Sequence, residues 1–351
     1  MQVNGKPYRT VWMEDGAVKM INQLLLPHAF EILKLPDHRA VAEAIISMAV
    51  RGAGAIGVAA AYGMAQVARE APEQGFWDYV ADGTLRLQKT RPTAQNLFYA
   101  VKKVNDAMRD APNIKEARRV AQEVAQGIAD ADVAQCESIG CHGAKLIKNG
   151  ARILTHCNAG WLAFADWGSA LAPIYRAKRQ GKDVFVFCDE TRPRCQGTIL
   201  TAWELDQEGI DYAVIADNAA GYFMHRGDVD FAITGADRIA ANGDTANKIG
   251  TYEKAVIAHE NHIPFYIAAP STTIDLKCPS GDRIPIEERS EEEVLGAIGV
   301  TDNGIVTSVR IAHKEAHARN PAFDVTPAQY ITGIITEYGV SKPEEIRERI
   351  Q

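Results

Sequence analysis

Short apolar runs alternate with helical stretches through the second half of this 351-residue chain, and this alternation constrains the fold more than any other feature. The runs lie at residues 152–156, 183–188, 211–216, 229–234 and 263–268. Parallel strands need long crossover connections, which are usually helices, so strands that alternate with helices predict a parallel sheet. We therefore expect an α/β domain in this half of the chain.

The first half of the chain has a helical pattern instead. Residues from about 38 to 130 are rich in Ala, Glu, Gln, Lys and Arg, with apolar residues at helical spacing. Pro72, Pro92 and Pro112 should divide this region into separate helices, because proline removes a helix hydrogen bond. A long helical pattern from about Val120 to Lys148 should bridge the two halves. The chain exceeds the usual size of one core, so we expect a mainly helical domain at 1–130 and an α/β domain at 131–351.

Composition and charge narrow the function classes. Hydrophobic residues make up 46% and charged residues 24%, and no apolar run reaches the roughly 18 residues that a membrane span needs. A net charge of −7 argues against a nucleic-acid partner, since phosphate neutralisation needs a basic face. Six cysteines without a CxxC pair and histidines without ligand spacing predict no metal site and no disulfide framework. The polar N-terminus is unlike a signal peptide, so we expect a cytoplasmic protein without a membrane partner.

Three polar loops follow apolar runs in the α/β half. Cys157 directly follows the run at 152–156, Asp237 follows the run at 229–234, and the segment Val184–Pro193 ends in Asp-Glu-Thr-Arg-Pro. In an open α/β sheet, ligands bind in the crevice at the carboxyl ends of the strands. A thiol and a carboxylate could therefore meet over one substrate. A lone cysteine is more often inert packing, so the residues alone leave both roles open for Cys157.

The segment Arg51–Gly57 has the GxGxxG spacing of a dinucleotide site. That fingerprint should follow a strand, whereas Ala42–Val50 has a helical pattern, so we reject a nucleotide cofactor there. The glycines instead open a predicted helix at Ala55–Ala68. Its free N–H groups and its dipole, with Arg51 alongside, would attract a phosphate. Tight helix packing by small residues is the alternative explanation for the same glycines.

Polar residues at a second predicted helix start form another candidate site. The turn signal at Ala241–Asp244 predicts a helix that begins at Thr245 and places Asn247 and Lys248 at its N-terminus. An anion or a sugar hydroxyl would bind there, although Lys248 has the alternative of being a solvated surface lysine. Two further candidates in loops carry weaker signals: Arg91 and Gln196.

Short motifs extend along nearly the whole chain. They are Arg-Gly-Ala-Gly-Ala-Ile-Gly from Arg51, Arg-Pro-Thr-Ala-Gln-Asn from Arg91, Leu-Thr-His-Cys-Asn from Leu154, Asp-Glu-Thr-Arg-Pro from Asp189, Gln-Gly from Gln196, Gly-Ala-Asp-Arg-Ile from Gly235, Asn-Lys-Ile-Gly-Thr from Asn247 and Asn-Pro-Ala-Phe-Asp-Val-Thr-Pro from Asn320. Together they resemble the methylthioribose-1-phosphate isomerase family, which is homologous to the regulatory subunits of the translation-initiation guanine-nucleotide exchange factor. The resemblance implies a helical N-terminal domain, a Rossmann-like C-terminal domain, a homodimer and no cofactor.

The resemblance also implies roles for individual residues. Cys157 and Asp237 would form the catalytic pair. The substrate ligands would be Arg51, Gly52, Ala53, Arg91, Gln196, Asn247 and Lys248. The chain departs from the common family pattern at Gly54, at the aromatic residues that follow Cys157, and at Arg194 with Cys195.

The implied reaction converts 5-methylthioribose 1-phosphate to 5-methylthioribulose 1-phosphate in methionine salvage. A phosphate on the anomeric oxygen blocks opening to a free aldehyde, so Asp237 would protonate the ring oxygen as a general acid. Hydrogen then moves from C2 to C1, either as a proton through Cys157 or directly as a hydride. The alternatives are an isomerase of 5-deoxyribose 1-phosphate or ribose 1,5-bisphosphate, and a non-catalytic regulatory subunit that binds sugar phosphates.

Overall fold

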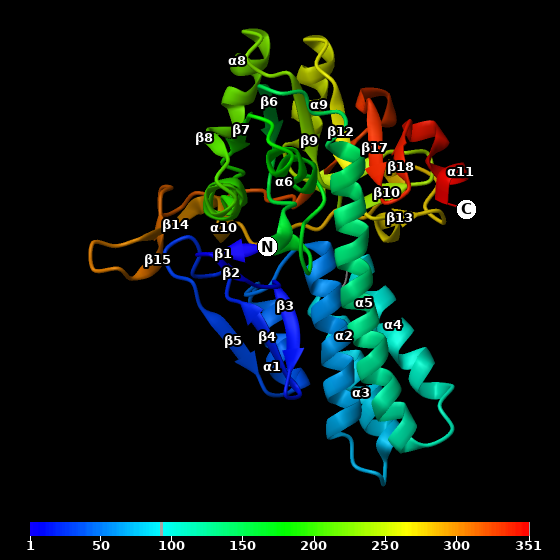
Figure 1. Ribbon diagram of the computed structural model, residues 1–351. Coiled ribbons are helices and arrows are strands. Elements are labelled where there is room, and N and C mark those ends of the chain that lie inside the picture. Colours follow the sequence, from blue (N-terminus) through cyan, green and yellow to red (C-terminus); the bar gives the residue numbers. More distant parts are fainter. Residues whose placement is uncertain (92–93, 351) are drawn as a thin grey trace. The chain divides into compact units, whose positions relative to one another are not determined.

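The computed structural model describes residues 1–91 and 94–350, which form two compact units (Figure 1). The first unit comprises Met1–Leu24, Phe30–Glu137 and Gly160–Gly168, and the second comprises Leu25–Ala29, Ser138–Ala159 and Ser169–Gln351. The chain passes from one unit to the other within helix α5 (Ile114–Gly143). The domain boundary at residue 130 stays a prediction.

The first unit combines short N-terminal strands with helices. Strands β3 (Val11–Glu14), β4 (Ala17–Ile21) and β5 (Ile32–Leu35) form an antiparallel sheet, and β1 (Gln2–Val3) pairs with β2 (Lys6–Pro7). The helices are α1 (His38–Ile46), α2 (Ala53–Glu70), α3 (Phe76–Thr90), α4 (Gln95–Arg109) and most of α5. The predicted helical N-terminal region is confirmed, and strands that the sequence pattern did not reveal precede its first helix.

Helix α2 lies at the centre of the first unit's core. Its residues from Gly54 to Ala68 are all buried, and most of them are alanine, glycine or valine. Small side chains let neighbouring helices approach closely: a Cβ on Gly83 of α3 would lie 2.5 Å from a methyl group of Val67. Helices α1, α3 and α4 all pack against α2. The helix is two residues longer at each end than the predicted Ala55–Ala68.

The predicted proline breaks coincide with helix ends. Helix α2 ends before Pro72 and α4 ends before Pro112, while Pro92 lies outside the described residues. Helix α5 begins earlier than the predicted Val120, because Asn113 accepts a hydrogen bond from the amide of Glu116 at 3.0 Å and so caps the first turn. It also ends before the predicted Lys148, since turns follow Gly143.

A sheet of seven strands, within residues 151–341, forms the centre of the second unit. The order across the sheet is β18-β17-β12-β9-β6-β7-β8, and only the pair β17 and β18 is antiparallel. The strands are β6 (Ala151–Thr155), β7 (Val184–Asp189), β8 (Asp211–Ile215), β9 (Phe231–Thr234), β12 (Phe265–Ala268), β17 (Gly333–Thr336) and β18 (Gly339–Ser341). The first five confirm the predicted apolar runs to within two residues.

The order of the parallel strands defines where a ligand should bind. Helices α6 (Ala172–Arg179), α7 (Ala202–Gln207), α8 (Ala220–His225) and α9 (Thr251–Glu260) alternate with these strands along the chain. Numbered along the chain, the parallel strands lie in the order 3-2-1-4-5-6, which is the Rossmann order. The order reverses between β6 and β9, and open α/β sheets bind ligands at the carboxyl ends of strands at such a switch point. The Rossmann-like α/β class is therefore confirmed.

A smaller sheet in the second unit corrects one prediction. Its order is β13-β10-β11-β16, and its strands are β10 (Arg238–Ala240), β11 (Thr245–Lys248), β13 (Ile274–Asp275) and β16 (Phe323–Thr326). The helix predicted to begin at Thr245 is wrong, because β11 pairs with β10 on one side and with β16 on the other. Helix α9 begins only after Gly250, whose φ of 99° favours glycine.

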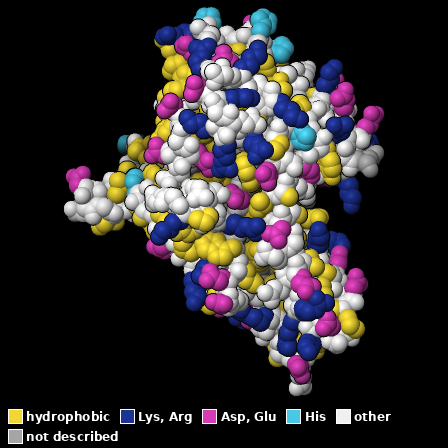
Figure 2. Space-filling model, in the orientation of Figure 1, with side chains coloured by type: hydrophobic (Ala, Val, Ile, Leu, Met, Phe, Trp, Pro, Cys, Tyr) yellow, Lys and Arg dark blue, Asp and Glu magenta, His cyan; other side chains and the backbone are white. Residues whose placement is uncertain are grey.

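The second unit also contains a β-hairpin and two short helices. Strands β14 (Gly296–Val300) and β15 (Val306–Arg310) form the hairpin, and the helices are α10 (Glu292–Leu295) and α11 (Ile346–Ile350). On the face shown in Figure 2, basic and acidic side chains are interspersed. Among residues 1–91 and 94–350, no helix is long and apolar enough to cross a membrane.

Candidate functional site

Cys157 and Asp237 stand in the two loops that flank the switch point. Cys157 follows the end of β6 by two residues, and Asp237 follows the end of β9 by three. Strands β6 and β9 are parallel neighbours, so both loops leave the same edge of the sheet. The loops also pack against each other, because a Cβ on Gly235 would lie 2.6 Å from the Cβ of Ala159. The structure therefore brings the predicted catalytic pair into adjoining loops.

Hydrogen bonds fix the backbone of Cys157 in an unusual conformation. Its φ of 65° lies in the left-handed region, which residues other than glycine rarely adopt. The hydroxyl of Thr191 accepts from the Cys157 amide at 2.8 Å, and the hydroxyl of Thr201 donates to the Cys157 carbonyl at 2.7 Å. Strained backbone persists where its surroundings over-determine it, and such residues cluster in active sites. The backbone that carries this half-buried thiol is thus held from both sides.

A buried polar network supports Thr201. The side-chain amide of Asn158 donates to the Thr201 hydroxyl at 3.1 Å and to a carboxylate oxygen of Glu204 at 2.7 Å. The hydroxyl of Tyr175 donates to the other Glu204 oxygen at 2.6 Å. Burial, together with the neighbouring Glu204 charge, raises the pKa of Tyr175 well above its usual value, so its hydroxyl stays a donor. Buried polar groups are stable only when they are hydrogen-bonded, and this network therefore has one preferred arrangement.

The loop after β7 supports Cys157 from the other side. Strand β7 is the second parallel neighbour of β6, and Thr191 follows it with a φ of 64°. The carboxylate of Asp217 accepts from the amides of Thr191 and Arg192, each at 2.7 Å. Thr191, which binds the Cys157 amide, is therefore itself fixed by a second loop.

Gln196, a predicted substrate ligand, is buried beside the same loop. A Cβ on the next residue, Gly197, would lie 1.6 Å from the carbonyl oxygen of Asp189, so only glycine fits there. Within the described residues, Oε1 of Gln196 has no hydrogen-bond partner. A buried amide oxygen without a partner is costly, and this oxygen is available to accept from a ligand hydroxyl.

Asp237 immediately precedes strand β10 of the smaller sheet, and Asn247 lies on the neighbouring strand β11. Asp237 is half-buried between β9 and β10, and its amide donates to the carbonyl of Ala246 at 2.9 Å. Asn247 is the next residue after Ala246, and its side-chain amide donates to the hydroxyl of Thr251 at 2.9 Å. The pairing of β10 with β11 thus brings both predicted residues to one place.

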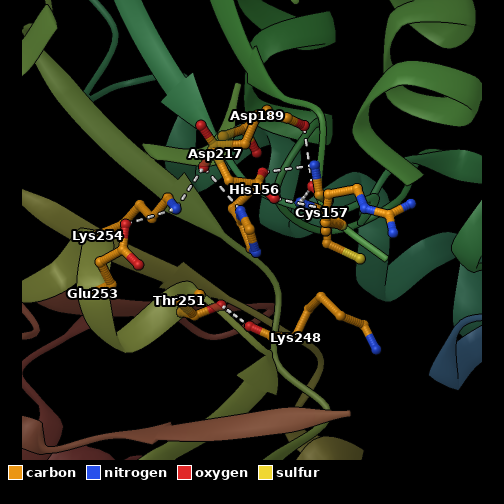
Figure 3. Close-up of polar contacts among 12 residues, drawn as sticks. His156, Cys157, Asp189, Asp217, Lys248, Thr251, Glu253 and Lys254 are labelled. Atoms are coloured by element: carbon orange, nitrogen blue, oxygen red, sulfur yellow. Dashed lines mark hydrogen bonds and ion pairs between the residues drawn. The ribbon is translucent and has the colours of Figure 1, made fainter. Parts of the chain in front are cut away.

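Lys248 is a packed residue, and the solvated-lysine alternative is wrong. Its ammonium donates to the carbonyl of Ala322 at 2.9 Å and lies 4.6 Å from the centre of the Phe323 ring. An ammonium has three N–H donors and no acceptor, so the Lys248 side chain is chemically suited to an anion. In Figure 3 the side chains of Lys248 and Cys157 point to the same side of the view.

The other predicted ligands belong to the first unit: Arg51, Gly52, Ala53 and Arg91. Gly52 precedes α2 with a φ of 91°, and no side chain caps this N-terminus within the described residues. A Cβ on Gly52 would lie 2.5 Å from the Cα of Ala163, and one on Gly54 would lie 2.3 Å from the Phe164 ring. Close packing by these glycines is therefore confirmed, and a phosphate at this N-terminus stays a prediction.

His156, Asp189 and Asp217 bring possible metal-ligand atoms within 4.8 Å of one another (Figure 3). Existing hydrogen bonds account for this grouping. Both ring nitrogens of His156 have partners, and Asp217 accepts from two amides. The ammonium of Lys254 also lies 3.6 Å from Asp189 Oδ2, so a resident cation would be repelled there. The absence of a metal stays our prediction.

Two other thiols near the strand ends differ from Cys157. Cys188 on β7 is fully buried, and burial raises the pKa of its thiol far above the usual range. Burial also raises the pKa of the half-buried Cys195 thiol. Both thiols therefore stay protonated at neutral pH and serve packing.

Sequence reasoning missed the side chains that hold the Cys157 loop: His156, Thr191, Thr201, Glu204 and Asp217. Thr191 lies in the Asp-Glu-Thr-Arg-Pro motif, which was a usable signal, and His156 lies beside Cys157. Thr201 and Glu204 gave no signal, because they stand in a helical stretch of ordinary composition and reach the site only through the fold.

Known proteins resemble this chain over nearly its full length. Residues 49–343 match the Initiation factor 2 subunit family. A methylthioribose-1-phosphate isomerase of Methylocella silvestris is 49% identical over 356 residues, covering 97% of this chain and 96% of that protein. An enzyme of the same name from Escherichia coli is 49% identical over 352 residues, covering 97% and 93%.

Two solved structures are also similar. The 5-methylthioribose 1-phosphate isomerase from Pyrococcus horikoshii has a TM-score of 0.87 and 44% identity, covering 98% of this chain and 95% of that one. The translation initiation factor eIF-2B subunit delta from A. fulgidus has a TM-score of 0.83 and 39% identity, covering 97% of each chain.

Proposed function

The chain belongs to the Initiation factor 2 subunit family, and we propose that it is an aldose–ketose isomerase that converts 5-methylthioribose 1-phosphate to 5-methylthioribulose 1-phosphate. Relatives named methylthioribose-1-phosphate isomerase match it at 49% and 50% identity over nearly their full length. The observation that carries the proposal is the pair of adjoining loops at the switch point, one with Cys157 and the other with Asp237. A carboxyl group supplies the proton for ring opening, and a thiol beside it can carry the proton that moves from C2 to C1.

Asp237 is the residue that we assign to ring opening. The anomeric oxygen carries the phosphate, so the bond from C1 to the ring oxygen must break with the phosphate still attached. The Asp237 carboxylic acid donates a proton to the ring oxygen as this bond breaks. The open-chain cation at C1 then shares its charge with the phosphate-bearing oxygen.

Cys157 is the residue that we assign to hydrogen transfer. Its thiolate takes the proton from C2 and returns it to C1, while the C2 hydroxyl loses its own proton to the Asp237 carboxylate. The product is a ketone at C2, and both residues regain their starting protonation states. A hydride that moves directly from C2 to C1 gives the same product, and Cys157 then orients the sugar.

Cationic and N–H groups would hold the phosphate and the sugar hydroxyls. We assign the phosphate to Arg51, the N–H groups of Gly52 and Ala53, Arg91 and Lys248. We assign the hydroxyls to Gln196 and Asn247. The unpartnered buried oxygen of Gln196 supports its role, and the packing of Lys248 against Phe323 keeps its ammonium in place.

The group at C5 decides among the candidate substrates. One extra methylene-sized unit in an apolar pocket is worth only about 1–3 kcal/mol in discrimination, so such a pocket prefers methylthio over a 5-deoxy methyl group by only about 10–200-fold. 5-Deoxyribose 1-phosphate is therefore a slower second substrate. Ribose 1,5-bisphosphate needs a cation for its second phosphate, and the candidate Arg194 already pairs with Glu293 at 3.1 Å.

Assembly and location form part of the proposal. We propose a cytoplasmic homodimer, as the family resemblance implies. Sedimentation equilibrium of the purified chain measures the state directly, and a monomer at micromolar concentration contradicts the homodimer.

Phosphorus and proton NMR test the function. The purified protein is incubated with 5-methylthioribose 1-phosphate, 5-deoxyribose 1-phosphate or ribose 1,5-bisphosphate in separate samples. We expect fastest conversion of the first to its 1-phosphorylated ketose, and deuterium from D2O at C1 supports the proton route. A folded protein that converts none of the three contradicts the isomerase, and favours the regulatory-subunit alternative that the eIF-2B likeness represents.

A further inference from the structure

His156 is a buried histidine that connects two separate segments of the second unit (Figure 3). Its side chain is 1% exposed. Its Nδ1 lies 2.8 Å from Oδ2 of Asp189, and its Nε2 lies 2.8 Å from the carbonyl oxygen of Ile249. Asp189 ends β7, and Ile249 lies in the turn between β11 and α9. One imidazole ring therefore bridges two loops of the candidate site.

The partners of the ring determine its protonation pattern. A carbonyl oxygen can only accept, so Nε2 must carry a hydrogen. A second proton lies between Nδ1 and Asp189 Oδ2, on the nitrogen or on the oxygen, because two acceptors cannot hydrogen-bond without one. Both ring nitrogens are therefore engaged, and the ring cannot rotate without losing both bonds.

The turn that contains Ile249 is held from a second side as well. The carboxylate of Asp324 accepts from the amides of Gly250 at 2.6 Å and Tyr252 at 3.1 Å. A Cβ on Gly250 would lie 3.0 Å from Cε1 of His156, so the ring lies directly against this turn. His156 thus fixes the carbonyl of Ile249, and Asp324 fixes the amides of Gly250 and Tyr252 in the same turn.

The charges around Asp189 strengthen this bridge. The ammonium of Lys254, 1% exposed, lies 3.6 Å from Asp189 Oδ2 and 3.2 Å from a carboxylate oxygen of Glu253. Burial raises the pKa of Asp189, while His156 and Lys254 act in the opposite direction. Removing one partner of such a buried group is costly, so the cluster favours one geometry.

The chain positions of the two bonds link the bridge to the chemistry. His156 immediately precedes Cys157, and Ile249 immediately follows Lys248. We propose that His156 is a positioning residue that holds the Cys157 loop and the Lys248 turn in one arrangement, so that the thiol and the ammonium meet the same sugar phosphate. The inference rests on the proposed function, which assigns the thiol to hydrogen transfer and the ammonium to phosphate binding.

Two substitutions separate the two hydrogen bonds. The amide nitrogen of asparagine occupies roughly the place of Nδ1, whereas that of glutamine reaches roughly the place of Nε2. His156→Gln therefore keeps the bond to Ile249 and loses the bond to Asp189, and His156→Asn does the reverse. Steady-state rates with 5-methylthioribose 1-phosphate give kcat and KM for each variant.

We expect one variant to change mainly KM and the other to change mainly kcat. His156→Asn releases the Lys248 turn, so we expect KM to rise about 10-fold or more, with kcat changed less. His156→Gln releases the Cys157 loop from Asp189, so we expect kcat to fall about 10–100-fold, the range of a small misplacement, with KM changed less. Equal changes in both constants for both variants, or no change in either, would overturn the proposal.

The first unit offers a matched control. His38 is 3% exposed, and its Nδ1 lies 2.8 Å from a carboxylate oxygen of Glu70. His38→Gln removes a buried histidine–carboxylate pair without touching either loop, so we expect a lower melting temperature and unchanged kcat and KM. Kinetic losses in His38→Gln equal to those in His156→Gln would show a stability effect only and would contradict positioning.

Two further measurements cover other failures. If neither variant folds, nitrogen-15 NMR of the wild-type ring decides: we expect a hydrogen on Nε2 of His156 that is hydrogen-bonded to the carbonyl of Ile249 and exchanges slowly with solvent, and an Nε2 without a hydrogen overturns the bridge. If the wild type converts no sugar, only the proposed function fails. Binding of inorganic phosphate then tests the inference, because His156→Asn should weaken it and His38→Gln should not; equal affinities overturn it.

Discussion

The cores of the two units consist of different kinds of side chain. Around α2 the first unit is filled by alanine, valine, glycine and larger apolar residues, and Gln66 is the polar exception in that helix. Beside the strand ends of the second unit, the buried side chains include His156, Asp189, Glu204 and Lys254. Apolar packing fixes volume but tolerates many arrangements, whereas a network of directional hydrogen bonds favours one. The first unit should therefore respond to core substitutions in stability, and the second in activity as well.

The largest effect should come from the two residues at the switch point. Asp237→Asn and Cys157→Ser each remove a proton-transfer group and should lower kcat about 10²–10⁴-fold. Melting temperatures should change little, since both side chains are only half-buried. Near-normal turnover in either variant would remove that residue from the chemistry.

The cationic residues should give the next largest effect. A hydrogen bond to a charged group contributes about 1.5–3 kcal/mol, so Lys248→Met should raise KM for 5-methylthioribose 1-phosphate roughly 10–100-fold. Arg51→Ala tests the same role in the first unit. Titration of inorganic phosphate measures the loss for both, and an unchanged affinity in one variant discards its phosphate role.

Thr201 tests the polar network without touching a proposed ligand. Thr201→Val keeps the shape but removes the bond to the Cys157 carbonyl and the acceptor of Asn158. We expect kcat to fall about 10-fold, beyond any loss in the folded fraction. Thr336→Val is the matched control in the same unit, because Thr336 is buried and its hydroxyl accepts from the Tyr338 amide at the β17–β18 turn, away from the Cys157 loop. Equal kcat for both variants would contradict a directing role of the network.

A buried carboxyl in the first unit and a half-buried carboxyl in the second differ in their pH dependence. Burial raises the pKa of Asp132 in the first unit to about 7, although the hydrogen bond from the Ala165 amide acts in the opposite direction. Glu293 in the second unit pairs with Arg289 and Arg194, and despite partial burial its pKa falls to about 2. The free energy of unfolding of the wild type should therefore fall as the pH rises from about 4 to 7, because over this range the folded chain keeps the proton on Asp132 and the unfolded chain has released it. Through Glu293, stability should be lost only as the pH falls from about 4.5 towards 2.

The smallest effect should come from Asp132→Asn. Its stability relative to the wild type should rise from pH 4 to pH 7, with kcat unchanged at pH 8. Urea unfolding at several pH values measures the difference. A constant difference across this range would show that Asp132 does not take up a proton on folding.

The sequence predicted what depends on local pattern. Alternating runs predicted the strands β6, β7, β8, β9 and β12, and the prolines at 72 and 112 coincide with predicted helix breaks. Lys248 shows where local pattern fails: turn residues before Thr245 indicated a helix, but pairing with β10 and β16 makes the segment a strand. Strand pairing is a long-range property that no window of sequence contains.

The site shows the same division. Cys157 and Asp237 could be singled out because each follows an apolar run, and the Rossmann order then brings their loops together. The bridge by His156 could not be predicted, because its partners Asp189 and Ile249 lie on other strands and turns. To predict where the His156 ring points, one must know how β6, β7 and β11 are placed relative to one another.

The most direct test is a crystal structure of the Asp237→Asn variant with 5-methylthioribose 1-phosphate. We predict that C1 and C2 of the sugar lie between the Cys157 thiol and the side chain at position 237, with the ammonium of Lys248 on the phosphate. A sugar phosphate bound away from the loops after β6 and β9 would contradict the assignment of the active site to the switch point.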